Sequence, residues 1–317
     1  MEVRALLVAE KLKSFVGALQ FVSKSGKEIS IECYADTVVL RALNDSHSAA
    51  AEITFASSYF REYMLPHELR HRQGTDTPLV KCTTLASTLL SIFKTTKNVI
   101  SVEITLELEG SPSSEEALEA NVIKFRMHCD RMITKTHRIR LTESQTMRPV
   151  FDKSASPHRI KIRPFHLMTL LQHIYGTDEV CMSISSTQVK FESYYTNPMD
   201  VKNHVHTETT VDNTEFISFA FDEAAAADES EIVQLIFCLK EIKALLAFCV
   251  ACTLPELSFY FSRGGSPILL ATESLQDSTY AAEIVLSTVT TFVTGPSQST
   301  TTGSQEAEYS QKRRRQE

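Results

Sequence analysis

The sequence lacks long hydrophobic runs and carries no excess of positive charge. No apolar run reaches the ~20 residues of a membrane-spanning helix, and the short apolar run after Arg4 ends at Glu10, which is not a signal-peptide pattern. With 32 Lys and Arg against 39 Asp and Glu, the net charge is −7. We therefore expect no membrane segment and no leader. A general polyanion-binding surface is excluded, so any contact with nucleic acid has to use basic residues concentrated on one face.

The sequence also lacks the motifs of metal and catalytic sites. Its seven cysteines are odd in number and mostly lie in apolar runs, which is typical of buried reduced thiols in an intracellular protein. Cys249-x-x-Cys252 is the one close pair, and no second Cys pair or spaced His pair accompanies it, so we expect no metal and no cofactor. There is no Gly-rich phosphate loop, Ser nucleophile elbow or Cys–His arrangement. We therefore expect that the chain is not an enzyme.

What the sequence does contain is a repeated order of helices and strands. Its 317 residues suggest about two domains. Apolar residues at helical spacing predict helices over Glu10–Val22, Thr84–Thr96, Pro164–Ile174 and Leu239–Val250, and alternating runs between them predict strands. Each half therefore has the order strand, helix, strands, helix, strands. We predict an α+β fold in which one unit with two helices occurs twice.

A polar stretch divides the two halves. Residues 142–157 contain two prolines and one isolated apolar pair, Val150-Phe151, so they are predicted to be a linker. We divide the chain into a first domain (1–141), this linker, a second domain (158–294) and a disordered tail (295–317). The tail ends in the basic run Lys312–Arg315, which is compatible with a nuclear import signal.

The stretch from Thr37 to Tyr63 is predicted to be a β-hairpin, because two apolar runs flank the turn Asn44-Asp45-Ser46-His47. The amino-acid sequence of this hairpin resembles that of the first hairpin of the DNA sliding clamps. Two further segments, 135–158 (KTHRI … VFDKSASPH) and 237–248 (FCLKEIKALLAF), resemble the Rad-nine subunit of the heterotrimeric nine-one-one DNA-damage checkpoint clamp. The resemblance covers about residues 1–290.

This resemblance implies two tandem sliding-clamp domains with the fold of proliferating cell nuclear antigen, each with two helices packed on antiparallel sheets. It implies a ring with two other clamp subunits, in which strands face outward and helices line the hole. A clamp loader would place the ring on double-stranded DNA at damage sites, without sequence preference, and the ring would recruit checkpoint kinase activators and repair enzymes. The implied location is the nucleus.

The resemblance also assigns expected roles to residues. The residues expected to face DNA are Lys11, Lys13, Lys24, Lys94, Lys97, Arg163, Lys240 and Lys243. The residues expected at the two subunit edges are Arg138, Arg140, His204 and His206. The residues expected to form a partner pocket beneath the linker are Leu43, His47, Val150, Phe151, Pro267 and Ile284. In the tail, Ser297, Ser304 and Ser310 precede glutamines and are phosphorylation candidates.

Alternatives remain open at each of these positions. Any one exposed lysine can be merely solvated, and Phe151 can simply fix the linker. His204-x-His206 alternates as metal ligands do, but no third ligand is close in sequence, so we expect an edge strand instead. For the whole chain, the alternatives are a 3′–5′ exonuclease, an activity associated with the family, and a homotrimeric replication clamp. The tail is shorter than in known relatives.

Overall fold

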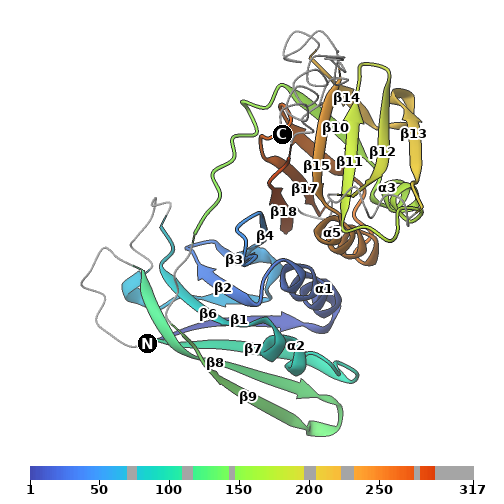
Figure 1. Ribbon diagram of the computed structural model, residues 1–317. Helices are drawn as coiled ribbons and strands as arrows, with labels where there is room; N and C mark the ends of the chain where they lie inside the picture. The colour runs from blue at the N-terminus through green and yellow to red at the C-terminus, as the bar shows by residue number, and fades with distance from the viewer. Residues whose placement is uncertain are drawn as a thin grey trace, which may run out of the picture.

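The computed structural model of the chain describes residues 1–69, 77–108, 117–142, 147–195, 205–222, 232–274 and 279–289. Within these ranges the fold is α+β, as predicted (Figure 1). The first half contains β1 (Glu2–Val8), α1 (Ala9–Ser25), β2 (Glu28–Cys33), β3 (Thr37–Leu43), β4 (Ala49–Ala56), β5 (Glu62–Met64), β6 (Val80–Leu85), α2 (Ala86–Ile92), β7 (Val99–Leu108), β8 (Leu118–Cys129) and β9 (Thr134–Arg140). No helix among the described residues is both long and apolar enough to span a bilayer.

The second half repeats the pattern with its own two helices. It contains β10 (His158–Ile162), α3 (Pro164–Leu171), β11 (Glu179–Ile184), β12 (Gln188–Tyr194), β13 (Glu208–Asp212), β14 (Ser218–Ala220), β15 (Val233–Cys238), α5 (Leu239–Ala251), β16 (Leu257–Phe261), β17 (Ile268–Glu273) and β18 (Tyr280–Leu286). The predicted linker lies between β9 and β10, and its described residues contain neither helix nor strand.

The two halves share one sheet. Strands β18 and β4 pair antiparallel from Tyr280 opposite Phe55 to Leu286 opposite Ala49, and this ladder joins the strands of both halves into a 14-stranded sheet. A second sheet has the order β13-β12-β11-β15. The buried side chains of both halves form one continuous cluster, so the chain folds around a shared core.

Helices α1 and α5, one from each half, pack against each other. Phe21 stacks on Phe248 with ring centroids 6.0 Å apart. A Cβ atom on Gly17 would lie 3.2 Å from the Phe248 ring, and Ala18 is fully buried. Glycine at position 17 therefore permits the close approach of α1 to α5, because a larger side chain there would meet the Phe248 ring.

Two predicted element boundaries were wrong. The helix expected at Thr84–Thr96 is only α2, Ala86–Ile92, because Thr84 and Leu85 continue β6 and pair with Ile29 and Glu28 of β2. The strand expected at 203–210 is β13, Glu208–Asp212, because its residues pair with Gln188–Glu192 of β12. In both places sheet pairing overrides the local spacing of apolar residues.

The predicted hairpin is confirmed as β3 and β4, paired from Thr37 opposite Ala56 to Leu43 opposite Ala50. The Asn44 side chain closes the turn, because its Oδ1 accepts the amides of Ser48 at 2.8 Å and Ala49 at 3.0 Å. Asparagine favours turns through such local bonds. The turn therefore projects beyond the sheet with a defined conformation.

Candidate nucleic-acid interface and subunit edges

Of the residues expected to face DNA, Lys11, Lys13, Lys24, Lys240 and Lys243 lie on α1 and α5, whereas Lys94 and Lys97 follow α2 and Arg163 precedes α3. Lys11 is half-buried, with its ammonium 5.6 Å from the centre of the Tyr59 ring, and the other expected DNA-facing residues are exposed. We call these exposed residues the helix face. The helix face consists of Lys13, Lys24, Lys94, Lys97, Arg163, Lys240 and Lys243. In Figure 1, α1, α5 and α3 lie to the right of the linker trace, so the linker and the helices occupy different sides of the chain.

The charges of the helix face are not neutralised. None of these residues forms an ion pair with a carboxylate in the described part of the chain. The four helices contain five lysines but only two acidic residues, Glu10 and Glu241, and Glu241 is only 4% exposed. The helices thus reverse the charge balance of an acidic chain, which is what a phosphate-contacting surface requires.

The charged residues on the strands behave differently. On β7 and β8 they alternate with buried residues, and on β9 Arg138 and Arg140 flank the half-buried Ile139, so they lie on the side of the sheet away from the helices. We call this surface the sheet face; it consists of Glu103, Glu107, Lys124, Arg126 and Arg138. Lys124 pairs with Glu107 at 2.9 Å and Arg126 with Glu103 at 3.1 Å, and Arg138 pairs with Glu107. Hydrogen bonds from Lys124 and Arg138 lower the pKa of Glu107, so this carboxylate stays charged.

The two halves contribute jointly to one groove beside the helix face. Lys24 at the end of α1 and Lys240 at the start of α5 line it together with Lys27, and its volume is about 670 Å³. Lys27 was not predicted, although it follows the helix directly. It forms an ion pair with Asp45 of the hairpin turn, and this hydrogen bond raises the pKa of Lys27. Free positive charge in the groove therefore comes from Lys24 and Lys240.

Both expected subunit edges are unpaired on one side among the described residues. Strand β9 pairs only with β8, and β13 pairs only with β12. Arg138 and Arg140 are exposed on β9. His206 precedes β13, and His204 lies outside the described residues. An open edge strand is a template for another chain, so both edges are available for subunit pairing.

The expected partner pocket is only partly assembled as a surface. Leu43 and Phe151 are half-buried, and His47 and Pro267 are exposed. Val150 is 96% exposed, whereas Ile284, a residue of β18, is completely buried in the core. Ile284 therefore cannot touch a docked partner, because the alternation of β18 turns it toward the helices rather than outward.

Ionic contacts that were not predicted fix the linker. Arg148 donates to the buried carboxylate of Glu32 at 2.8 Å and lies 5.7 Å from the centre of the Tyr34 ring. Arg41 holds the other Glu32 oxygen at 2.9 Å, and Lys153 pairs with Glu283. Glu32 and Arg148 are 116 residues apart, so no local pattern links them. The linker is thus attached by ionic contacts in addition to the half-buried Phe151.

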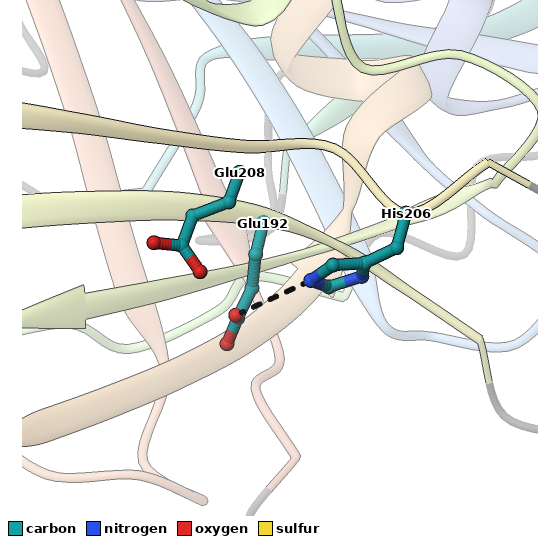
Figure 2. Close-up of side chains that lie close together, drawn as sticks. All are labelled: Glu192, His206 and Glu208. Carbon is teal, nitrogen blue, oxygen red and sulfur yellow. Dashed lines mark ion pairs between the residues drawn. The ribbon is translucent and has the colours of Figure 1, made fainter.

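The strand pairing brings two carboxylates to His206 (Figure 2). Glu192 on β12 and Glu208 on β13 lie directly opposite each other, and the ligand atoms of all three side chains lie within 4.8 Å of one another. The imidazole Nε2 of His206 is 4.0 Å from a Glu192 oxygen. Glu208 follows His206 by two residues and was overlooked in the sequence, whereas Glu192 is brought to them only by the pairing of β12 with β13.

The cysteine pair shows no sign of a reactive or metal-binding thiolate. Cys249 is buried and Cys252 is half-buried. Burial raises the pKa of Cys249 to about 12 and also raises the pKa of Cys252. Both thiols are therefore protonated at neutral pH, and nucleophilic or thiolate-ligand chemistry is disfavoured.

The tail candidates Ser297, Ser304 and Ser310 lie outside the described residues.

The repeated halves, the shared sheet and the helices gathered beside it define a sliding-clamp fold. The structure is similar to that of PCNA from Thermococcus kodakaraensis, with a TM-score of 0.61 over 90% of this chain and 99% of that chain at 10% sequence identity. The predicted fold is therefore confirmed.

A family model described as Rad9 matches residues 15–289, so the chain belongs to the Rad9 family. "DNA repair protein rad9" of Schizosaccharomyces pombe is 23% identical over 84% of this chain and 66% of the relative, and its Schizosaccharomyces octosporus counterpart is 24% identical over 84% and 65%. "Cell cycle checkpoint control protein Rad9" of Drosophila melanogaster is 23% identical over 80% and 50%. The chain thus spans about two thirds or less of these relatives' lengths.

Proposed function

We propose that this chain is one subunit of a heterotrimeric ring that encircles double-stranded DNA and acts in DNA-damage checkpoint signalling and repair. The observation that carries the proposal is the unpaired positive charge of the helix face in a chain of net charge −7. Family membership and the names of the relatives support the biological setting, including the nucleus. A ring that slides needs phosphate contacts without base readout, and lysines on helices provide such contacts.

Charge reversal tests the DNA-binding part. The variant K240E/K243E is assembled with the two other clamp subunits and loaded by a clamp loader on closed circular DNA. The amount of ring that stays on the DNA should be at least about ten times lower than with wild type. Its salt dependence should also flatten, because each lost phosphate contact removes about 0.9 from the slope. The matched control is K124E/R126E on the sheet face, which should retain DNA normally. Equal retention of the two double variants would contradict the proposal.

The open edges β9 and β13 support assembly with other subunits. Light scattering should find the isolated chain as a monomer that enters a trimer only with two different clamp subunits. A homotrimer of this chain alone would instead favour a replication clamp. Substituting Arg140 by Pro on β9 should prevent trimer formation, because proline removes an edge amide, while the monomer stays folded.

We further propose that the linker recruits repair enzymes and checkpoint kinase activators. The exposed Val150 and the half-buried Phe151 support this, since they form an apolar pair on a polar linker to which a partner can dock. Phe151→Ala should weaken binding of clamp-docking peptides and leave ring assembly unchanged. Loss of assembly would show a purely structural role.

We propose that the chain acts as a platform and has no catalytic role of its own. The test is incubation of the purified chain with Mg²⁺ or Mn²⁺ and DNA labelled at the 3′ end. A label-releasing activity that co-purifies with the chain would establish a nuclease instead, provided that the variant E192Q/E208Q lacks this activity.

A further inference from the structure

The side chains around His206 form a compact set of nitrogen and oxygen donors on the outer side of the small sheet. Glu192 and Glu208 face each other across β12 and β13, and His206 lies two residues before Glu208, so its side chain projects to the same side. Directly opposed like charges destabilise a strand pair. This arrangement therefore favours a cation between the two carboxylates.

The imidazole is oriented toward these carboxylates. Its Nδ1 lies 3.4 Å from the Ser193 hydroxyl, which also accepts the amide of Thr207 at 3.0 Å. Ser193 is 4% exposed, so this contact is well fixed. The contact leaves Nε2 as the ring nitrogen that faces Glu192 (Figure 2). A hydrogen bond to the remote ring nitrogen is how proteins orient histidine ligands for metals.

Lysine already supplies part of the cationic charge. The Lys190 ammonium lies 3.1 Å from Glu192 and 3.4 Å from Glu208. Two carboxylates and one ammonium leave one negative charge, so Lys190 does not neutralise the cluster. The ammonium lies within ion-pair distance of both carboxylates and therefore competes with any bound cation.

We propose that Glu192, His206 and Glu208 form a binding site for a divalent transition-metal ion of the Zn²⁺ class at the edge strand β13. One imidazole and two carboxylates suit Zn²⁺, whereas Mg²⁺ prefers oxygen donors alone. Tetrahedral Zn²⁺ with bonds of about 2.0–2.2 Å places its ligand atoms roughly 3.4 Å apart. The present separations, up to 4.8 Å, close to this value by side-chain rotation, and the ion displaces Lys190.

The bound ion would tie the start of β13 to β12. Zn²⁺ takes four ligands, and the described residues provide three, so one position remains for water or for a group on a subunit paired with β13. The proposal concerns the isolated chain and does not depend on ring assembly or on DNA binding, so the two proposals fail separately.

Zn²⁺ titration of the metal-free full chain, by calorimetry with a competing chelator, tests the site. Wild type should bind one ion through these side chains. E192Q and H206A should each weaken binding by at least roughly tenfold, since even partners of metal ligands contribute about 10–100-fold. The matched controls E103Q, at a half-buried glutamate, and H173A, at an exposed histidine, both away from the cluster, should bind as wild type.

Two further measurements separate this site from adventitious binding. K190M should tighten Zn²⁺ binding roughly thirtyfold, because a single positive charge about 4 Å from a divalent ion in water repels it by about that factor. Co²⁺ bound at the site should show no thiolate charge-transfer band, which excludes the seven cysteines as ligands. Equal binding by wild type, E192Q and H206A, a thiolate band that persists in H206A, or no binding by wild type would each overturn the proposal.

Discussion

The helix face and the sheet face use similar basic residues in opposite ways. On the sheet face, Lys124, Arg126 and Arg138 each have a carboxylate partner. On the helix face no lysine or arginine has such a partner among the described residues, and apolar contacts such as Phe21 with Phe248 hold the helices instead. The difference teaches that stability and charge are separated here. Apolar packing positions the helices, with one added contact from the Lys243 ammonium, which donates to the Ile174 carbonyl at 3.0 Å, and carboxylates in the described part of the chain leave these charges unpaired.

The largest effect that this comparison predicts lies beneath the helix face. Phe248 is 3% exposed and stacks on Phe21, so Phe248→Ala should lower the free energy of unfolding by about 4 kcal/mol. Phe248→Leu, which keeps most of the volume, should cost much less. Urea denaturation measures both. Equal stability of Phe248→Ala and wild type would show that the α1–α5 contact does not hold the helices.

A somewhat smaller effect is expected where strand charges are buried. Arg41 is 7% exposed and contacts Glu32 and Glu52 at 2.9 Å and 2.6 Å. Arg41→Met should lower the free energy of unfolding by about 3 kcal/mol, because it leaves the buried Glu32 carboxylate with fewer partners. Arg41→Lys should recover part of this loss. If Arg41→Met is neutral in urea denaturation, charge pairing is not what stabilises the strands under the linker.

The exposed ion pairs of the sheet face should affect titration more than folding. The Lys124 and Arg138 hydrogen bonds lower the pKa of Glu107, so their stabilisation is present above the usual carboxylate range and is lost as pH falls through the lowered pKa. Lys124→Met should move the pKa of Glu107 back toward its usual value. Carboxylate NMR signals followed between about pH 2 and 7 measure this. An unchanged pKa of Glu107 would contradict the pairing, and Glu103 serves as the internal reference.

The smallest effect on folding is expected on the helix face itself. Lys13→Gln and Lys24→Gln should each change the free energy of unfolding by no more than about 0.5 kcal/mol, because neither residue has a carboxylate partner in the part of the chain that the structure describes. The same pair of substitutions should weaken retention on DNA in the assembled ring. A large loss of stability would show that these lysines have a structural role and would weaken the comparison.

Local patterns predicted the fold well where side-chain spacing decides the structure. The helical spacing of Leu12, Phe15 and Leu19 placed α1, and Asn44 placed the hairpin turn. The extent of α2 and β13 could not be predicted, since pairing with β2 and β12 decides it. Contacts distant in sequence were also missed. Arg148 with Glu32, and Glu192 with His206, depend on chain folding rather than on spacing.

The pairing of β18 with β4 has a mechanical consequence. Its seven registered residue pairs and the α1–α5 contact cross the same junction between the halves. Bending the chain there would break a hydrogen-bonded ladder and also separate the packed aromatic side chains of Phe21 and Phe248. The two halves therefore behave as one rigid unit. In the proposed ring, strain from opening would therefore concentrate at the proposed subunit edges β9 and β13, each of which pairs with one strand only among the described residues.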